Sequence, residues 1–190
     1  MIKFHDVKTT DRELVQSYTL CSDRQNCDLS FANIISWRFL YNTQIAEVDG
    51  FLVFRFYIGH HLAYMAPVWK GEWNELMSEP FAKVVRQMRD DSITLGHPFL
   101  MLGVCTNMVE ILESIFPDTF YIKPDRDYFD YIYTREKLAT LAGKKLQSKR
   151  NHCNRFRKTY PNYEYRPLTK DMIPECLAVE ANWRTVTKED

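Results

Sequence analysis

The amino-acid sequence predicts an α/β fold of the α+β kind, built on one mixed sheet. Three observations lead to this prediction. Apolar residues recur at helical spacing in several segments, two runs rich in β-branched and aromatic residues flank the turn dipeptide Asp49-Gly50, and Pro98–Cys105 is a continuous apolar run typical of a buried strand. The expected order of elements is β-α-α-β-β-β-α-β-α-β-β, ending near Thr134.

The first predicted elements are a short strand and two helices. Ile2–Phe4 is the expected strand, and Thr10 with Glu13 has the spacing of a capping box at the start of the first helix. A second helix should begin at Ser30, because apolar side chains recur at helical spacing after it.

An antiparallel meander of three strands should follow. Gln44–Val48 and Phe51–Ile58 form its hairpin, since Asp49-Gly50 accepts the positive φ angles of a tight turn. Leu62–Ala66 is the third strand, and Pro67 ends it.

The remaining elements of this first domain are two helices and three strands, each recognised from its apolar residues. In chain order they are a helix within Glu72–Asp90, a strand at Pro98–Cys105, a helix capped by Thr106 or Asn107 and ended by Pro117, and strands at Thr119–Ile122 and Tyr128–Tyr133. The first domain is therefore expected to cover residues 1–134.

A helical connector follows the first domain and covers residues 135–161. Its two predicted helices are Arg135–Leu141 and Lys144–Tyr160, separated by a break at Ala142-Gly143.

The beginning of a second domain is expected after the connector. Tyr163–Arg166 has the composition of a strand, and a helix should begin at Lys170. Because one strand and one helix cannot bury their apolar faces alone, residues 162–190 are interpreted as an incomplete second domain that resembles the first.

The distribution of charge draws attention to the connector. The chain's 25 basic and 25 acidic residues cancel, yet Lys144–Lys158 holds seven of the basic residues and no Asp or Glu, so 18 basic residues stand against 25 acidic ones elsewhere. Such a local concentration attracts anions whatever the net charge. The candidate anion-binding residues are Lys144, Lys145, Lys149, Arg150, His152, Arg155 and Arg157.

The basic helix also carries an apolar stripe of Leu146, Cys153, Phe156 and Tyr160, and a helical wheel puts Lys149 inside that stripe. An ammonium group on a packing face must extend to water, pair with a carboxylate or hold a ligand anion. The alternative is a solvated basic helix that binds no ligand.

Three stretches of the chain, Asp28–Arg38, Ala142–Phe156 and Tyr163–Thr169, resemble a known family. They are similar to an uncharacterised bacterial family related to the C-terminal domain of phosphatidylglycerol lysyltransferase. The middle stretch, with its Gly-Lys-Lys, Lys-Arg-Asn and Phe pattern, is the most specific part and also resembles the connector of Fem-type aminoacyltransferases. The element order resembles the GNAT acyltransferase fold.

The resemblance implies a function as well as a fold. Relatives carry two tandem GNAT-like domains and transfer an amino acid from aminoacyl-tRNA to an amine or hydroxyl of a lipid or peptide. We therefore expect an acyl or aminoacyl transferase whose connector binds tRNA or an anionic lipid headgroup and whose first domain packs against the second. No catalytic residue can be named from the sequence.

Cofactor and metal sites are not expected. The loop Pro67–Trp73, where an acetyl-CoA enzyme of this fold would hold a pyrophosphate, has one glycine and two tryptophans. The adjacent His60 and His61 fall at a predicted turn, and the five cysteines are scattered without a CxxC pair, so disulfides and structural zinc are disfavoured. Cys105 is interpreted as a buried structural thiol.

The N-terminus has no signal-peptide core and no apolar run reaches membrane-spanning length, which predicts a cytoplasmic protein. Peripheral contact with an acidic membrane surface stays open. Two other functions also stay open: a non-catalytic module whose connector binds RNA or acidic lipid, and an acetyl-CoA-dependent N-acetyltransferase.

Overall fold

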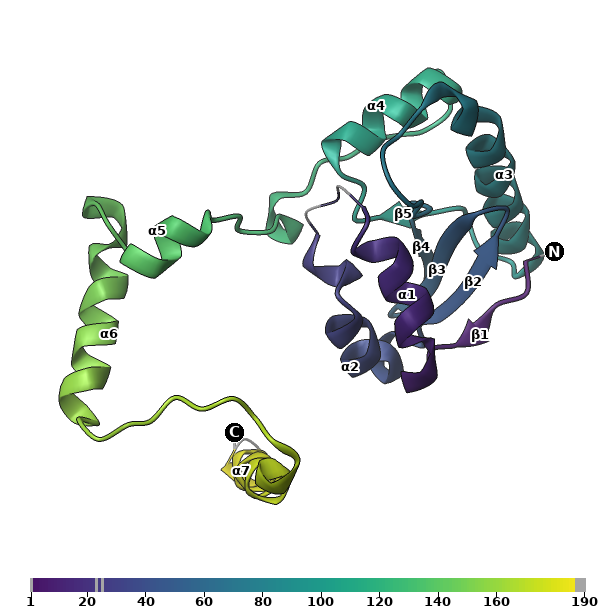
Figure 1. Cartoon of the computed structure of the whole chain (residues 1–190). Coiled ribbons are helices and arrows are strands. Elements are labelled where there is room, and N and C mark those ends of the chain that lie inside the picture. Colours follow the sequence, from purple (N-terminus) through teal and green to yellow (C-terminus); the bar gives the residue numbers. More distant parts are fainter. Residues whose placement is uncertain (1, 23, 25, 187–190) are drawn as a thin grey trace. The chain divides into compact units, whose positions relative to one another are not determined.

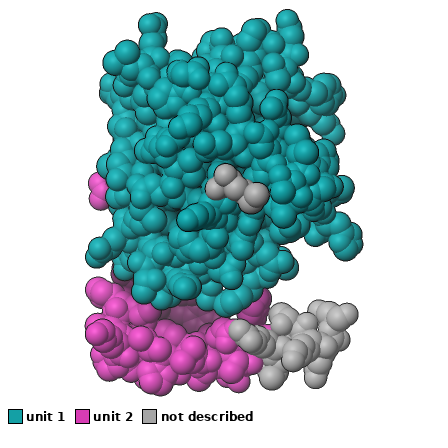
Figure 2. All heavy atoms as spheres, turned by 90° about the vertical axis from the view of Figure 1, so that its right-hand side faces the viewer, with its two compact units in different colours: residues 1–132 teal, residues 133–190 magenta. Residues whose placement is uncertain are grey.

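The computed structural model of the chain describes residues 2–22, 24 and 26–186, the last three by their backbone alone. It consists of two compact units, Met1–Ile132 and Tyr133–Asp190 (Figures 1 and 2). Each unit is described by itself below. No helix among the described residues is long and apolar enough to cross a membrane.

The first unit is built on a five-stranded mixed sheet (Figure 1). Its strands, in spatial order, are β1 (His5–Asp6), β2 (Gln44–Val48), β3 (Phe51–Ile58), β4 (His61–Met65) and β5 (Met101–Leu102). Neighbours pair antiparallel except β4 and β5, which are parallel. The hairpin between β2 and β3 is confirmed: Asp49 and Gly50 have φ angles of 47° and 83°, which match a type I′ turn.

Helices cover both faces of this sheet. They are α1 (Arg12–Thr19), α2 (Phe31–Tyr41), α3 (Ser78–Thr94) and α4 (Thr106–Ile115), with single 3₁₀ turns η1 (Thr9–Asp11), η2 (Cys27–Leu29), η3 (Glu75–Met77) and η4 (Arg126–Tyr128). Along β3, Leu52 and Phe54 pack with α1 and α2, while Phe51 and Val53 pack with α3 and α4 (Figure 1). Burial on both faces explains why β3 begins with an uninterrupted apolar run.

Two details of the N-terminal elements differ from the sequence prediction. Ile2–Phe4 is not a strand; β1 is the next two residues, and Ile2 and Phe4 pack into the core instead. The predicted capping box is also wrong, because it is the carboxylate of Asp11 that accepts a hydrogen bond, from the amide of Lys8 at 2.7 Å. The predicted start of the second helix is confirmed, with Ser30 as the N-cap of α2.

The predicted strand Pro98–Cys105 is shortened to β5 because β4 offers only Tyr64 and Met65 as pairing partners. Gly103, with a φ of 67°, then turns the chain away from the sheet. The helix that follows is α4, and its N-cap is Cys105 rather than Thr106 or Asn107.

The two strands predicted at Thr119–Ile122 and Tyr128–Tyr133 are wrong, since neither segment is a strand in the structure. Their aromatic composition suits a strand, but a strand also needs a partner, and the two-residue β5 offers almost no edge to pair with. Most of the aromatic side chains remain exposed, such as Tyr121 at 92%.

A single residue, Asp130, fastens this irregular segment to the rest of the first unit. Its carboxylate accepts hydrogen bonds from the amide of Cys27 at 3.1 Å and from the Cys27 thiol at 3.0 Å. The hydrogen bond to Asp130, with a smaller effect of burial, raises the pKa of Cys27 to about 11. Burial and the charge of Asp130 also raise the pKa of Asp28. These groups form a latch that sequence reasoning did not reveal.

The second unit is helical. It contains α5 (Arg135–Thr140), η5 (Lys144–Leu146), α6 (Gln147–Thr159), η6 (Lys170–Met172) and α7 (Ile173–Val186). The break between the two connector helices is confirmed at Leu141 and Gly143, whose φ angles are 48° and 88°. The helix after Lys170 is confirmed as well.

The strand predicted at Tyr163–Arg166 is wrong, because no described segment of the second unit is a strand that could pair with it. Whether residues 162–190 begin a second domain stays a prediction, and residues 187–190 lie outside the described part of the chain.

A buried network of polar side chains joins four strands to α3. Arg55 of β3 donates from Nη1 to Asp91 of α3 at 2.7 Å, and the Tyr64 hydroxyl of β4 donates to the same carboxylate oxygen at 2.6 Å. Arg55 also donates from Nε and Nη2 to Gln44 of β2, at 2.9 and 2.6 Å, and Gln44 donates to Asp6 of β1 at 2.8 Å. Only 6% of the Asp91 side chain is exposed, so its charge depends on these partners.

Replacing Asp91 with alanine should lower the free energy of unfolding by about 3 kcal/mol, because it leaves the Arg55 charge half-buried without its partner. Urea denaturation measures this as a lower midpoint at unchanged slope. The adjacent Asp90 is the matched control: its side chain is 67% exposed, and Asp90→Ala should change stability by less than about 0.5 kcal/mol. Equal effects of the two substitutions would contradict the importance of the network.

The stability of the first unit should fall at alkaline pH through two buried tyrosines. Burial, together with hydrogen bonds to Asp91 and Glu47, raises the pKa values of Tyr64 and Tyr18. A raised pKa contributes stability that is complete below the unfolded value of about 10 and is lost as the pH rises above it. The variant Tyr18→Phe/Tyr64→Phe should therefore show a shallower decline of unfolding free energy above about pH 10 than the unchanged protein. Parallel declines in the two proteins would show that these hydroxyls do not govern the pH dependence.

Candidate functional site

The connector's basic residues lie on η5 and α6, and one of them shapes the turn that precedes the helix. Arg150 donates from Nη1 to the carbonyl oxygens of Leu141 and Gly143, at 2.8 Å for the second. These carbonyls follow the end of α5, where cations and donors are favourable. Arg150 thus has a structural task in addition to any contact with an anion.

The other candidate residues, Lys144, Lys145, Lys149, His152, Arg155 and Arg157, are all exposed. Two of them contact neutral neighbours on α6: Arg155 lies 3.3 Å from Nδ1 of His152, and Arg157 donates to Asn154 at 3.3 Å. Within the described residues, no carboxylate forms an ion pair with any of the six. Their charge is therefore open to an external anion.

Lys149 does not occupy a packing position in the described unit. The helical wheel placed it inside the apolar stripe, whereas the structure leaves its side chain in solvent. The stripe itself is formed: the ring centroid of Phe156 lies 5.1 Å from that of Tyr160 and 5.2 Å from that of Tyr163. Lys149 therefore belongs with the exposed cations, and burial imposes no partner on it.

The loop at Pro67–Trp73 has no room for a pyrophosphate. Trp69 is 2% exposed, and its ring centroid lies 4.9 Å from that of Trp73. Both rings also contact Phe81, at 6.2 and 5.4 Å between centroids. This aromatic cluster occupies the place where backbone amides would have to surround a phosphate, so the residues present do not fit acetyl-CoA.

Two other sequence candidates are placed plainly by the structure. His60 and His61 lie at the exposed turn between β3 and β4, and Cys105 is half-buried at the start of α4. Among the described residues, no group of three His, Cys, Asp or Glu side chains could hold a metal ion.

Comparison with known proteins gives the chain its family. Residues 21–190 match the family described as "Phosphatidylglycerol lysyltransferase, C-terminal". No curated protein matches the chain.

A solved structure from Bacteroides thetaiotaomicron VPI-5482, described as a conserved protein of unknown function, is 52% identical, with a TM-score of 0.84. The match covers 99% of this chain and 61% of that one, so the chain spans about three fifths of its solved relative. The mixed α/β fold and the family match agree on an acyltransferase-related domain. The chain belongs to the family of phosphatidylglycerol lysyltransferase C-terminal domains.

Proposed function

We propose that this chain is part of an acyl or aminoacyl transferase in which η5 and α6 hold the phosphates of the donor, an aminoacyl-tRNA. The observation that carries the proposal is the row of exposed cations without a carboxylate partner among the described residues. The match to the lysyltransferase family supports a donor of this kind.

The position of these cations is unfavourable for the helix itself. Lys144 and Lys145 lie at the amino-terminal end of α6, where the helix dipole repels positive charge. Lys145 and Lys149 are one turn apart, and like charges at this spacing destabilise a helix. A bound polyanion would relieve both costs, which a merely solubilising charge pattern would avoid.

The proposed role of the chain in the reaction is positioning. An amine or hydroxyl of the acceptor attacks the ester carbonyl of the donor, and the tRNA hydroxyl leaves with a proton. Holding the donor's phosphates fixes the ester relative to the acceptor, which is a large part of such catalysis. We assign no residue of this chain to bond making, and we propose that a second domain supplies that part of the cleft.

Two alternatives fit the structure less well or predict a different result. An acetyl-CoA enzyme is disfavoured by the aromatic cluster of Trp69, Trp73 and Phe81. A non-catalytic module would bind RNA or acidic lipid through the same cations but would not transfer an aminoacyl group.

Reversing two exposed cations, Lys145→Glu/Lys149→Glu, should weaken tRNA binding by the whole protein at least tenfold, roughly, and should lower the slope of log K against log salt by about 2. Binding is measured at about 50 and 200 mM salt, with uncharged tRNA and with anionic vesicles as separate ligands. Transfer is followed as release of the amino acid from aminoacyl-tRNA in the presence of phosphatidylglycerol vesicles.

The matched control is Lys83→Glu/Arg86→Glu, which makes the same charge change on exposed side chains of α3. Loss of tRNA binding and of transfer only in the α6 variant supports the proposal. Binding of vesicles but not tRNA, or tRNA binding without transfer, would refute the transferase and favour the non-catalytic module. Equal behaviour of the two variants would refute any role of α6.

A further inference from the structure

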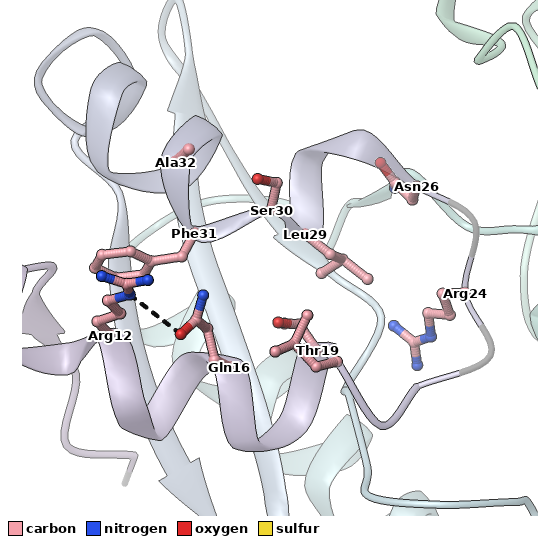
Figure 3. A pocket seen from close by; sticks show the side chains of 10 residues that line it. Arg12, Gln16, Thr19, Arg24, Asn26, Leu29, Ser30, Phe31 and Ala32 are labelled. Atoms are coloured by element: carbon pink, nitrogen blue, oxygen red, sulfur yellow. Dashed lines mark hydrogen bonds between the residues drawn. The ribbon is translucent and has the colours of Figure 1, made fainter. Parts of the chain in front are cut away.

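A cavity of about 550 Å³ lies between α1 and the start of α2, on the side of the first unit opposite α3 and α4 (Figure 3). It is separate from the connector, and its residues were not singled out by the sequence. Two helices and the loop between them form its walls, so their side chains converge on one space (Figure 3). Among the described residues that line it, none is acidic.

One wall of the cavity is a polar row on α1. Arg12, Gln16 and Thr19 follow one another at intervals of four and three residues, which places them on the same face of the helix (Figure 3). Arg12 donates from Nε to Gln16 at 3.2 Å, so the fork of its guanidinium is oriented while both terminal nitrogens stay available. No carboxylate of the described residues forms an ion pair with Arg12.

The opposite wall adds a hydroxyl and an apolar surface. Ser30 and Phe31 lie across from the polar row (Figure 3), and the side chain of Ser30 makes no hydrogen bond to the described residues. Leu29, which is 5% exposed, packs beneath them in the core. The cavity thus offers hydrogen-bond donors on one side and an apolar wall on the other.

Arg24 fixes the far end of the cavity. Its guanidinium donates from Nη1 to the carbonyl oxygen of Ala66 at 2.7 Å and from Nη2 to that of Pro67, and it lies 4.9 Å from the ring of Trp69. The loop between α1 and α2 is therefore fastened to the end of β4, and the cavity is pre-formed rather than collapsed.

We propose that this cavity binds a small amphiphilic oxyanion, a molecule with a terminal carboxylate or phosphate and a short apolar body. The planar fork of Arg12 holds the oxyanion by two parallel hydrogen bonds, and the hydroxyls of Thr19 and Ser30 supply further donors. The apolar body lies against Phe31. The site differs from α6 in requiring both ends of the ligand, whereas α6 requires charge alone.

The test is a titration of the whole protein, labelled with ¹⁵N, against hexanoate, hexyl phosphate, hexanol and inorganic phosphate. The expected result is saturable shifts of amide signals within residues 12–32 for hexanoate or hexyl phosphate, with at least about tenfold weaker binding of hexanol and of inorganic phosphate. Comparison of the two anionic amphiphiles identifies the preferred head group.

Arg12→Gln should weaken the preferred probe at least tenfold, roughly, while Arg89→Gln, an exposed arginine of α3, should leave it unchanged. Arg12 is exposed, so its loss should not unfold the protein, which the unchanged amide spectrum verifies. Shifts that do not saturate, equal binding of hexanol, or equal affinity of the Arg12 and Arg89 variants would each overturn the proposal. The outcome is independent of the tRNA experiment, because neither variant changes α6.

Discussion

The contact between Arg55 and Asp91 is the constraint on which the first unit depends. A carboxylate that is 6% exposed on α3 must face a cation and a hydroxyl, and β3 and β4 supply them as Arg55 and Tyr64. This requirement fixes the rotation of α3 over the sheet, because only one rotation of the helix brings Asp91 to both partners. The contacts of Phe81 with the rings of Trp69 and Trp73 follow from the same orientation.

The two candidate sites have different physical origins. The α1–α2 cavity is a product of tertiary packing, held open by Arg24 at the end of β4. The cations of η5 and α6 depend only on local helix geometry and on the staple from Arg150 to the preceding turn. A ligand of the first site is selected by shape and by both of its ends, whereas a ligand of the second is selected by the spacing of its charges.

Local features of the fold were predictable from the sequence, and features that depend on distant partners were not. The turn at Asp49-Gly50 and the break at Gly143 follow from the backbone preferences of a few residues, and both were predicted correctly. The strands expected after Pro117 failed because composition cannot reveal whether a sheet edge is available. The candidate cations were visible as a charge pattern, but the structural task of Arg150 was not, because it depends on where the carbonyls of the turn point.

The latch at Asp130 has a consequence for how the first unit comes apart. Residues 119–132 contain no strand and keep most of their aromatic side chains in solvent, while Asp130 holds the η2 turn through Cys27. Such a segment is expected to open locally at a small free energy while the sheet stays intact. Hydrogen exchange would then separate a fast class of amides after Phe120 from a slow class in β3 and α3. A single thiol–carboxylate contact would set the boundary between them.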